Sequence, residues 1–228
     1  EFKSLSGKMD AADSRATSVT EYLDGTAGFR TDLYATGGTL LSHAESIELI
    51  GSLGAKFTPE LKAPAVAMPF DGLTQAAYAQ QLIDEYKAAG VPAEDVWAQS
   101  FRLDDVLYWV RAEPRFANQA VYLDGRYDVD AFNHTAPSTY APTMRQLYEG
   151  GVCGVGVALG GLRVPDGDGA MAPSVYARAA RAAGLNLITW TLERSGSPPA
   201  GWYFQTVADL VRTDGDVLVA LDVLARQV

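Results

Sequence analysis

The feature that most constrains this chain is a repeated pattern of a capped helix, a glycine and a short apolar run. Thr74 can cap an amphipathic helix that continues to about Ala89, and Gly90 is placed to stop it. Residues 182–185 repeat the chemistry of residues 88–91, so two helices end in the same way before an apolar segment. Helices that alternate with strands at short intervals predict right-handed β-α-β units and a parallel sheet.

Five segments fit the strands of such a sheet, because each is short, is apolar or alternating, and lies between helical patterns. They are residues 56–62, 96–101, 120–124, 152–158 and 185–192. Helices are predicted over residues 43–53, 74–89, 104–112 and 216–226, with two more that begin at Pro142 and Pro173. Residues 1–40 lack a clear period and predict a loop-rich segment with one short helix near residues 19–23.

This order predicts an α/β fold of the (β/α)8 TIM-barrel type, because long polar loops follow the strands and tight turns precede them. A doubly wound open sheet is the alternative. Only five strands are visible where a barrel takes eight, so we expect an incomplete barrel whose first strands and closing strand are missing. Either strands lie hidden in residues 1–40 or, as we expect, the chain is part of a longer product. The predicted domains are an insertion-like segment, 1–40, and the later part of a barrel, 41–228.

Composition limits the partners of this chain. It has 228 residues, of which 48% are apolar, and a formal net charge of −10. Such acidity argues against nucleic acid or an anionic membrane surface as a partner. The sequence has no run of 18 apolar residues that would predict a membrane span, and its start does not resemble a signal peptide. Cys153 is the single cysteine and is expected to be a small buried side chain.

The most unusual polar residues lie in the first predicted strand, residues 56–62, which read Lys-Phe-Thr-Pro-Glu-Leu-Lys. With the two-residue period of a strand, Thr58, Glu60 and Lys62 lie on one face, whereas a buried parallel strand is usually apolar on both faces. One explanation is a site in which the Glu60 carboxylate binds a hard cation and the Lys62 ammonium binds an anionic oxygen. The alternative is an edge strand whose charges are solvated.

Other candidates end the remaining predicted strands. Because neighbouring strands of a barrel end at one mouth, these side chains are expected to converge, although strand ends are also polar wherever they meet solvent. Asp104 and Asp105 are explained by helix capping and the helix dipole. His43 and His134 are expected at the surface, although His134 lies in a loop, which is a more frequent place for function. The strand-end candidates are Gln99, Ser100, Asp124, Trp190, Thr191 and Glu193.

With these segments in place, the chain resembles the later part of the glycerophosphodiester phosphodiesterase family, in its larger secreted or periplasmic form. The resemblance covers almost the whole chain in order, and residues 5–10 and 31–34 resemble the insertion of those larger members. It rests on residues 57–62 (Phe-Thr-Pro-Glu-Leu-Lys), 96–101 (Val-Trp-Ala-Gln-Ser-Phe), 121–125 (Val-Tyr-Leu-Asp-Gly) and 188–193 (Ile-Thr-Trp-Thr-Leu-Glu).

The resemblance implies a secreted or periplasmic barrel hydrolase that converts glycerophosphodiesters to glycerol 3-phosphate and an alcohol with one divalent metal ion, Mg²⁺ or Ca²⁺. It implies that Glu60 ligates the metal, that Lys62 contacts the phosphate as a catalytic residue, and that Trp190 lines the substrate pocket. Gln99 and Phe101, on the neighbouring strand, are further substrate-binding candidates. The chemistry is coherent, because a cation and an ammonium both stabilise negative charge on a phosphoryl group.

The sequence departs from the family pattern in its catalytic motifs. The family's His-Arg, Glu-x-Asp and His-Asp motifs, which supply its acid, its base and most metal ligands, are absent from the chain. We therefore expect the 228-residue chain to be inactive alone, for want of an N-terminal segment that completes the barrel. Two alternatives stay open: a non-catalytic barrel module that binds phosphate or another ligand, and a metal-independent barrel hydrolase with paired carboxylates such as Glu60 and Glu193.

Overall fold

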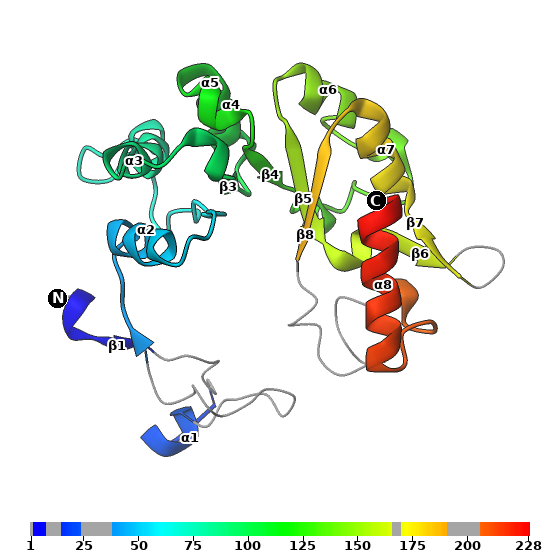
Figure 1. Ribbon diagram of the computed structural model, residues 1–228, viewed down its shortest axis with the longest axis horizontal. Coiled ribbons are helices and arrows are strands. Elements are labelled where there is room, and N and C mark those ends of the chain that lie inside the picture. Colours follow the sequence, from blue (N-terminus) through cyan, green and yellow to red (C-terminus); the bar gives the residue numbers. More distant parts are fainter. Residues whose placement is uncertain (1, 8–14, 24–37, 166–169, 191–205) are drawn as a thin grey trace. The chain divides into compact units, whose positions relative to one another are not determined.

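The computed structural model describes residues 2–7, 15–23, 38–165, 170–190 and 206–228 (Figure 1). The chain forms two compact units, Glu1–Leu49 and Ile50–Val228. The division predicted after residue 40 therefore falls within the first unit. Among the described residues, no helix is both long enough and apolar enough to cross a membrane.

The first unit includes the start of helix α2, His43–Ser52, which continues into the second unit. The predicted capping box is present: the backbone N–H of Ser42 donates to the Glu45 carboxylate at 2.7 Å, and the Glu45 N–H donates to Ser42 Oγ at 3.3 Å. The short helix predicted near residues 19–23 is also confirmed. The other elements of this unit are η1 Phe2–Ser4, β1 Ser6–Gly7, α1 Val19–Leu23 and β2 Gly38–Thr39, with β1 antiparallel to β2.

A parallel sheet lies at the centre of the second unit. Each neighbouring pair of strands runs in the same direction, and the longest ladder joins β5 to β8. The predicted parallel α/β arrangement is therefore confirmed. The order is β3-β4-β5-β8, with the bounds Gln99–Ser100, Val121–Leu123, Gly154–Ala158 and Asn186–Trp190.

The predicted strand at residues 56–62 joins this sheet beside β3, but it does not form a continuous strand. Phe57 pairs with Val96 and Glu60 pairs with Gln99, both in parallel. Pro59 lies between the two pairs and has no N–H to donate to the ladder, which explains the interruption.

Helices surround the sheet, and Figure 1 shows α6 and α7 beside β5 and β8. In the described part of this unit, five α-helices match predicted helices in order, and the short α5 is an addition that the sequence does not predict. These helices are α3 Gln75–Ala88, α4 Leu103–Ala112, α5 Pro114–Ala117, α6 Met144–Glu149, α7 Val175–Ala183 and α8 Asp214–Gln227. Short 3-10 helices are η3 Ala93–Asp95, η4 Arg126–Asp128, η5 Pro137–Thr139 and η6 Leu159–Gly161.

Helices α3 and α4 pack through the apolar stripe that the helical period predicts. Thr74 caps α3, because its hydroxyl oxygen accepts a hydrogen bond from the N–H of Ala77. Trp109 of α4 is fully buried and donates its indole N–H to the carbonyl of Ala79 at 2.9 Å. The buried stripe of α3 consists of Ala79, Leu82, Ile83 and Tyr86.

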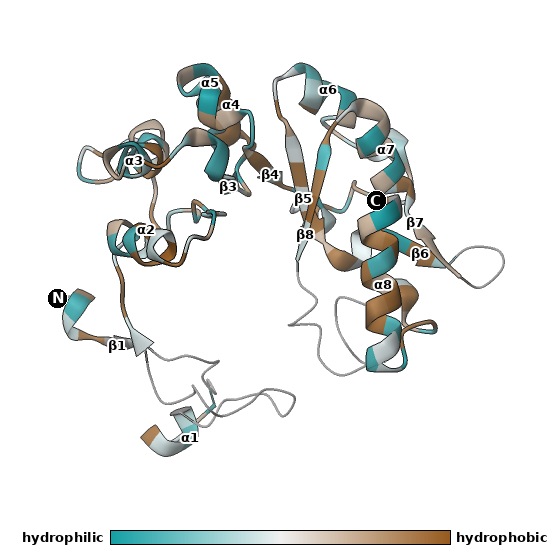
Figure 2. Ribbon diagram, in the orientation of Figure 1, coloured by the Kyte–Doolittle hydropathy of each residue, from teal (hydrophilic) through white to brown (hydrophobic). Residues whose placement is uncertain are grey.

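A second apolar cluster lies under α8, where Figure 2 shows hydrophobic residues along the helix. Ala220 and Val223 of α8 pack against Leu159, Val207 and Val211. A hairpin of β6, Arg163–Pro165, and β7, Met171–Pro173, contributes Met171 to this cluster. The sequence predicts a plain loop at this position, because glycine, aspartate and proline dominate it.

The predicted helix starts at Pro142 and Pro173 are wrong. Helix α6 begins at Met144 after the N-cap Thr143, and α7 begins at Val175 after the N-cap Ser174. In each case the hydroxyl oxygen accepts a backbone N–H from three residues ahead, at 3.1 and 3.0 Å. This side-chain cap fixes the helix start more strongly than the preference of proline for a first turn.

Candidate functional site

The carboxyl ends of the parallel strands bring several of the predicted site residues to one edge of the sheet. The segment that carries Glu60 is aligned with β3 by two backbone hydrogen bonds of 2.8 Å, one from the Gln99 N–H to the Pro59 carbonyl and one from the Leu61 N–H to the Gln99 carbonyl. Glu60 and Gln99 are therefore direct neighbours across this edge. We call this edge, with Glu60, Lys62, Gln99, Phe101 and Trp190, the strand-edge site.

Glu60 and Lys62 form an ion pair at the strand-edge site. The Lys62 ammonium lies 2.9 Å from a Glu60 carboxylate oxygen, and the two side chains are 77% and 26% exposed respectively. An exposed ion pair contributes little to stability, so the Lys62 ammonium can turn to an anionic ligand at small cost. The predicted placement of both charges on one face agrees with this contact.

The rings of Phe101 and Trp190 are in contact, although Phe101 follows β3 and Trp190 ends β8, the two outer strands of the four-stranded sheet. Their ring centroids are 5.9 Å apart, with the planes at 75°, an edge-to-face arrangement. Two glycines make room for them: a Cβ on Gly125 would lie 3.1 Å from Phe101, and a Cβ on Gly156 would lie 3.1 Å from Trp190. The rings therefore meet over the middle strands, β4 and β5.

Asp124 also ends a strand, but its carboxylate belongs to a different group of residues. It accepts two hydrogen bonds from the Arg126 guanidinium, at 2.8 and 2.6 Å, and one from the Tyr176 hydroxyl at 2.7 Å. Burial lowers the pKa of Arg126, but the hydrogen bond to Asp124 and its charge outweigh this, so the pKa lies above its usual value. Burial, reinforced by Asp124, holds the pKa of Tyr176 well above its usual value. The sequence pointed to Asp124 alone, since nothing in the pattern places Tyr176 beside it.

Ser100 and Asp105 hold the turn after β3. Asp105 is buried, and its carboxylate accepts hydrogen bonds from the Ser100 hydroxyl and from the Gln75 side-chain amide, both at 2.8 Å. Its predicted role in helix capping and the helix dipole does not account for this burial. The contact fixes the residues on either side of Ser100, which are Gln99 and Phe101 of the strand-edge site.

The remaining candidates lie elsewhere. His43 begins α2 in the first unit, and His134 lies in the loop between η4 and η5. Cys153 is only half-buried, and burial raises the pKa of its thiol. Thr191 and Glu193 lie outside the described residues.

The described residues do not fit a resident divalent cation. Magnesium and calcium need several oxygen ligands, whereas no three carboxylate, imidazole or thiol groups gather in the described part of the chain. Glu60 would supply one carboxylate, and that carboxylate is paired with Lys62. A metal ion at Glu60 accordingly stays a prediction.

Comparisons with known proteins identify one related sequence and solved structures with a similar fold. A scan against models of protein families finds no match. A curated protein named "Extracellular protein" from Arthroderma benhamiae is 45% identical over 227 residues, which cover 96% of this chain and 91% of that protein.

Two solved structures resemble this one. A candidate glycerophosphodiester phosphodiesterase from Galdieria sulphuraria matches with a TM-score of 0.51 and 17% identity, over 87% of this chain and 68% of its own. A candidate glycerophosphoryl diester phosphodiesterase from Silicibacter pomeroyi matches with a TM-score of 0.54 and 16% identity, over 94% and 65%. The chain thus spans about two thirds of each solved structure. These likenesses show a fold of the TIM-barrel type, as predicted.

Proposed function

Because this chain belongs to the family of the Arthroderma benhamiae extracellular protein, we propose that it is a secreted protein that binds a glycerophosphodiester at the strand-edge site. The bound diester is the substrate class of the phosphodiesterases that share the fold. The chemistry of such a site is hydrolysis to glycerol 3-phosphate and an alcohol.

The observation that supports this proposal best is the joint position of a cation and an aromatic pair at one end of a parallel sheet. In folds of this type, ligands bind at the carboxyl ends of the strands. Lys62 offers an exposed ammonium there, and Phe101 and Trp190 offer apolar rings. A glycerophosphodiester has the matching parts, a phosphate anion and an organic alcohol.

Each residue has a distinct role in the proposed complex. The Lys62 ammonium leaves Glu60 and donates to a phosphate oxygen, where it stabilises the negative charge as a catalytic residue. Trp190 and Phe101 contact the alcohol part of the diester. The Gln99 side-chain amide hydrogen-bonds to the glycerol hydroxyls. Within the described part of this edge, Glu60 is the carboxylate that could ligate Mg²⁺ or Ca²⁺, and no step of the proposed binding depends on that ion.

Binding and hydrolysis have different requirements. Hydrolysis of a phosphodiester needs a proton donor and acceptor beside the phosphate, and the sequence lacks the histidine motifs that supply them in the family it resembles. We therefore expect the 228-residue chain to bind the diester without turnover. A binding module with no catalytic role is the second candidate, and the pairing of the Glu60 carboxylate with Lys62 favours it.

The test is a calorimetric titration of the 228-residue chain with glycerophosphocholine, beside an assay for glycerol 3-phosphate release with Mg²⁺, Ca²⁺ or EDTA. Lys62→Ala should weaken binding about 10- to 100-fold, because a hydrogen bond to a charged group contributes ~1.5–3 kcal/mol. Lys56→Ala is the matched control, since Lys56 is also exposed but pairs with Asp95 at 2.8 Å. This control should bind like the original chain.

The outcomes separate the candidates. Binding that is lost in Lys62→Ala, without release of glycerol 3-phosphate, supports the strand-edge site, and the same release assay on the native-length gene product then distinguishes an enzyme from a binding module. Metal-dependent release of glycerol 3-phosphate that is lost in Glu60→Ala would support a metal ion at Glu60. It would also contradict the expectation that the 228-residue chain is inactive. Equal binding by the two lysine variants would reject the strand-edge site.

A further inference from the structure

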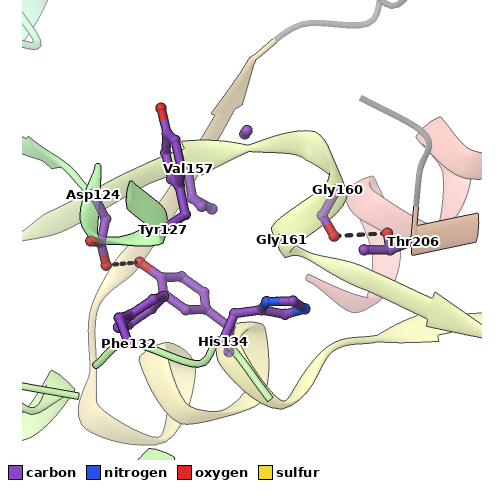
Figure 3. Close-up of a pocket in the computed structure, with 10 residues that line it drawn as sticks. Asp124, Tyr127, Phe132, His134, Val157, Gly160, Gly161 and Thr206 are labelled. Atoms are coloured by element: carbon purple, nitrogen blue, oxygen red, sulfur yellow. Dashed lines mark hydrogen bonds between the residues drawn. The ribbon is translucent and has the colours of Figure 1, made fainter. Parts of the chain in front are cut away.

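A partly open cavity of about 220 Å³ lies on the other side of the sheet, beyond the ends of β4 and β5 (Figure 3). Its walls come from four parts of the second unit. The loop after β4 supplies Tyr127, Phe132 and His134, and the end of β5 with η6 supplies Val157, Ala158, Gly160 and Gly161. Tyr176 of α7, Asp124 and Thr206 complete it.

The cavity and the strand-edge site lie on opposite faces of the sheet. A Cβ on Gly156 would meet Leu123 and Trp190, so these residues share the face of the strand-edge site. The neighbours Val157 and Asp124 lie on the other face, because side chains alternate along a strand. Asp124 is bound there by Tyr176 of α7. Of the strand residues that line the cavity, Ala158 alone lies by this alternation on the face of its ladder partner Trp190, so the cavity borders the proposed glycerophosphodiester site only at the end of β5.

The loop that lines the cavity is fixed in place by Arg126. Its guanidinium binds Asp124 and donates to the carbonyl of Pro142, so both ends of the loop are tied to one side chain. The same guanidinium lies 5.0 Å from the Phe132 ring centroid, and Phe132 stacks on Tyr140 at 5.1 Å. The wall that this loop forms is thus held in place by packed side chains, and the cavity is a formed part of the fold.

The lining is mainly apolar and contains one side chain that is ready to recognise a ligand. Asp124 is neutralised by Arg126, and the Thr206 hydroxyl donates to the Gly160 carbonyl at 2.8 Å. The imidazole of His134 makes no hydrogen bond with any residue in the described ranges, and Figure 3 shows its ring extending toward the Gly160 and Thr206 side. Apolar hollows of this size take up small apolar molecules.

From these observations we propose that the cavity binds a small uncharged molecule with an aromatic or aliphatic body and one hydroxyl group, which His134 orients. A cation is disfavoured, because the Asp124 carboxylate in the lining is already paired with Arg126. An anion is also disfavoured, because the described residues of the lining present the Asp124 carboxylate and no unpaired cationic side chain. Water is disfavoured, because apolar walls offer it too few partners.

The experiment is an NMR titration of the 228-residue chain with three probes: phenol, toluene and choline. Phenol should shift amides near His134 and Val157, with an affinity several-fold above that of toluene, and choline should cause no shift there. His134→Phe should retain toluene binding and remove the preference for phenol. Val157→Phe and Ala158→Leu are two independent variants that fill the cavity, and either one that keeps the native spectrum should abolish binding.

Each result decides one part of the proposal. If no probe shifts these amides, the cavity is not a binding site. Equal affinity for phenol and toluene in the original chain would show that His134 does not recognise the hydroxyl group. Preferential binding of choline would contradict the proposal that the ligand is uncharged. None of these measurements uses a glycerophosphodiester, so they succeed or fail independently of the proposed function.

Discussion

At the scale of single residues, Arg126 joins several parts of the second unit. It pairs with Asp124, whose side chain is 1% exposed, and it also contacts Phe132 and Tyr140 through their rings. A buried carboxylate that loses its partner keeps the cost of leaving water without the gain of the ion pair. The stability of this region therefore depends on the guanidinium, even though the pair itself is not expected to add much relative to apolar residues.

The first prediction at this scale is that Arg126→Ala lowers the free energy of unfolding by about 3–5 kcal/mol. The measurement is urea unfolding followed by circular dichroism. Arg145→Ala is the matched control, because Arg145 pairs with Glu149 at 3.6 Å on the surface of α6, with both side chains more than half exposed. It should change the free energy by about 0.5 kcal/mol or less. A similar loss in both variants would contradict the importance of the buried pair.

The same residues show what sequence can predict about a site. The strand-end positions of Glu60, Lys62 and Trp190 follow from the two-residue period and from the repeated pattern of strands and helices. The ion pair of Arg126 with Asp124 and the approach of Tyr176 do not, because Tyr176 lies 52 residues from its partner. Contacts of this kind depend on how α7 packs on the sheet.

At the scale of elements, the start of α2 shows how one carboxylate can secure a helix. Glu45 accepts hydrogen bonds from the Lys3 ammonium and from the backbone and hydroxyl of Ser42. The hydrogen bond from Lys3, followed by those from Ser42, lowers the pKa of Glu45 from 4.5 to about 2. A carboxyl with a lowered pKa stabilises the fold above its unfolded pKa, and this contribution disappears as the pH falls through the folded value.

We therefore expect the cap of α2 to persist below pH 4.5 and to be lost as the pH falls toward about 2. Carboxyl-carbon NMR of Glu45 should show a titration midpoint near the lower value. Lys3→Ala should move the midpoint upward, whereas Glu48→Gln, on the exposed side of the same helix, should leave it unchanged. If the titration midpoint of Glu45 is the same in Lys3→Ala, the hydrogen bonds from Ser42 alone lower the pKa.

Whole elements were predicted best where a side-chain cap and an apolar period agree, as in α3 between Thr74 and Gly90. The starts of α6 and α7 are predicted wrongly because proline favours a first helical turn at almost the same position as a hydroxyl N-cap. In both helices the N-cap, Thr143 or Ser174, determines where the helix begins. The β6–β7 hairpin was missed because its residues resemble a loop, and its pairing depends on packing under α8.

At the scale of the whole molecule, the sequence predicted the parallel α/β class and the barrel type, because these follow from the order of elements. The chemistry at the strand edge does not follow from the fold, since one fold carries many activities. The whole chain adds an electrostatic field to the site: the net charge is −10, whereas the ammonium of the strand-edge site is that of Lys62. The net charge repels an anion at long range, and Lys62 attracts it only at close range.

This opposition gives a prediction that rests on the proposed function. Glycerophosphoglycerol carries one negative charge, whereas glycerophosphocholine is neutral overall, and both present the same phosphate to Lys62. At about 0.01 M salt, where screening extends over ~30 Å, the anionic ligand should bind several-fold more weakly than at about 0.15 M. The affinity of the neutral ligand should change much less, as measured by calorimetry at both salt concentrations. If the anionic ligand instead binds more tightly at low salt, the local charge of the strand edge outweighs the net charge, and cations beyond Lys62 must face the ligand.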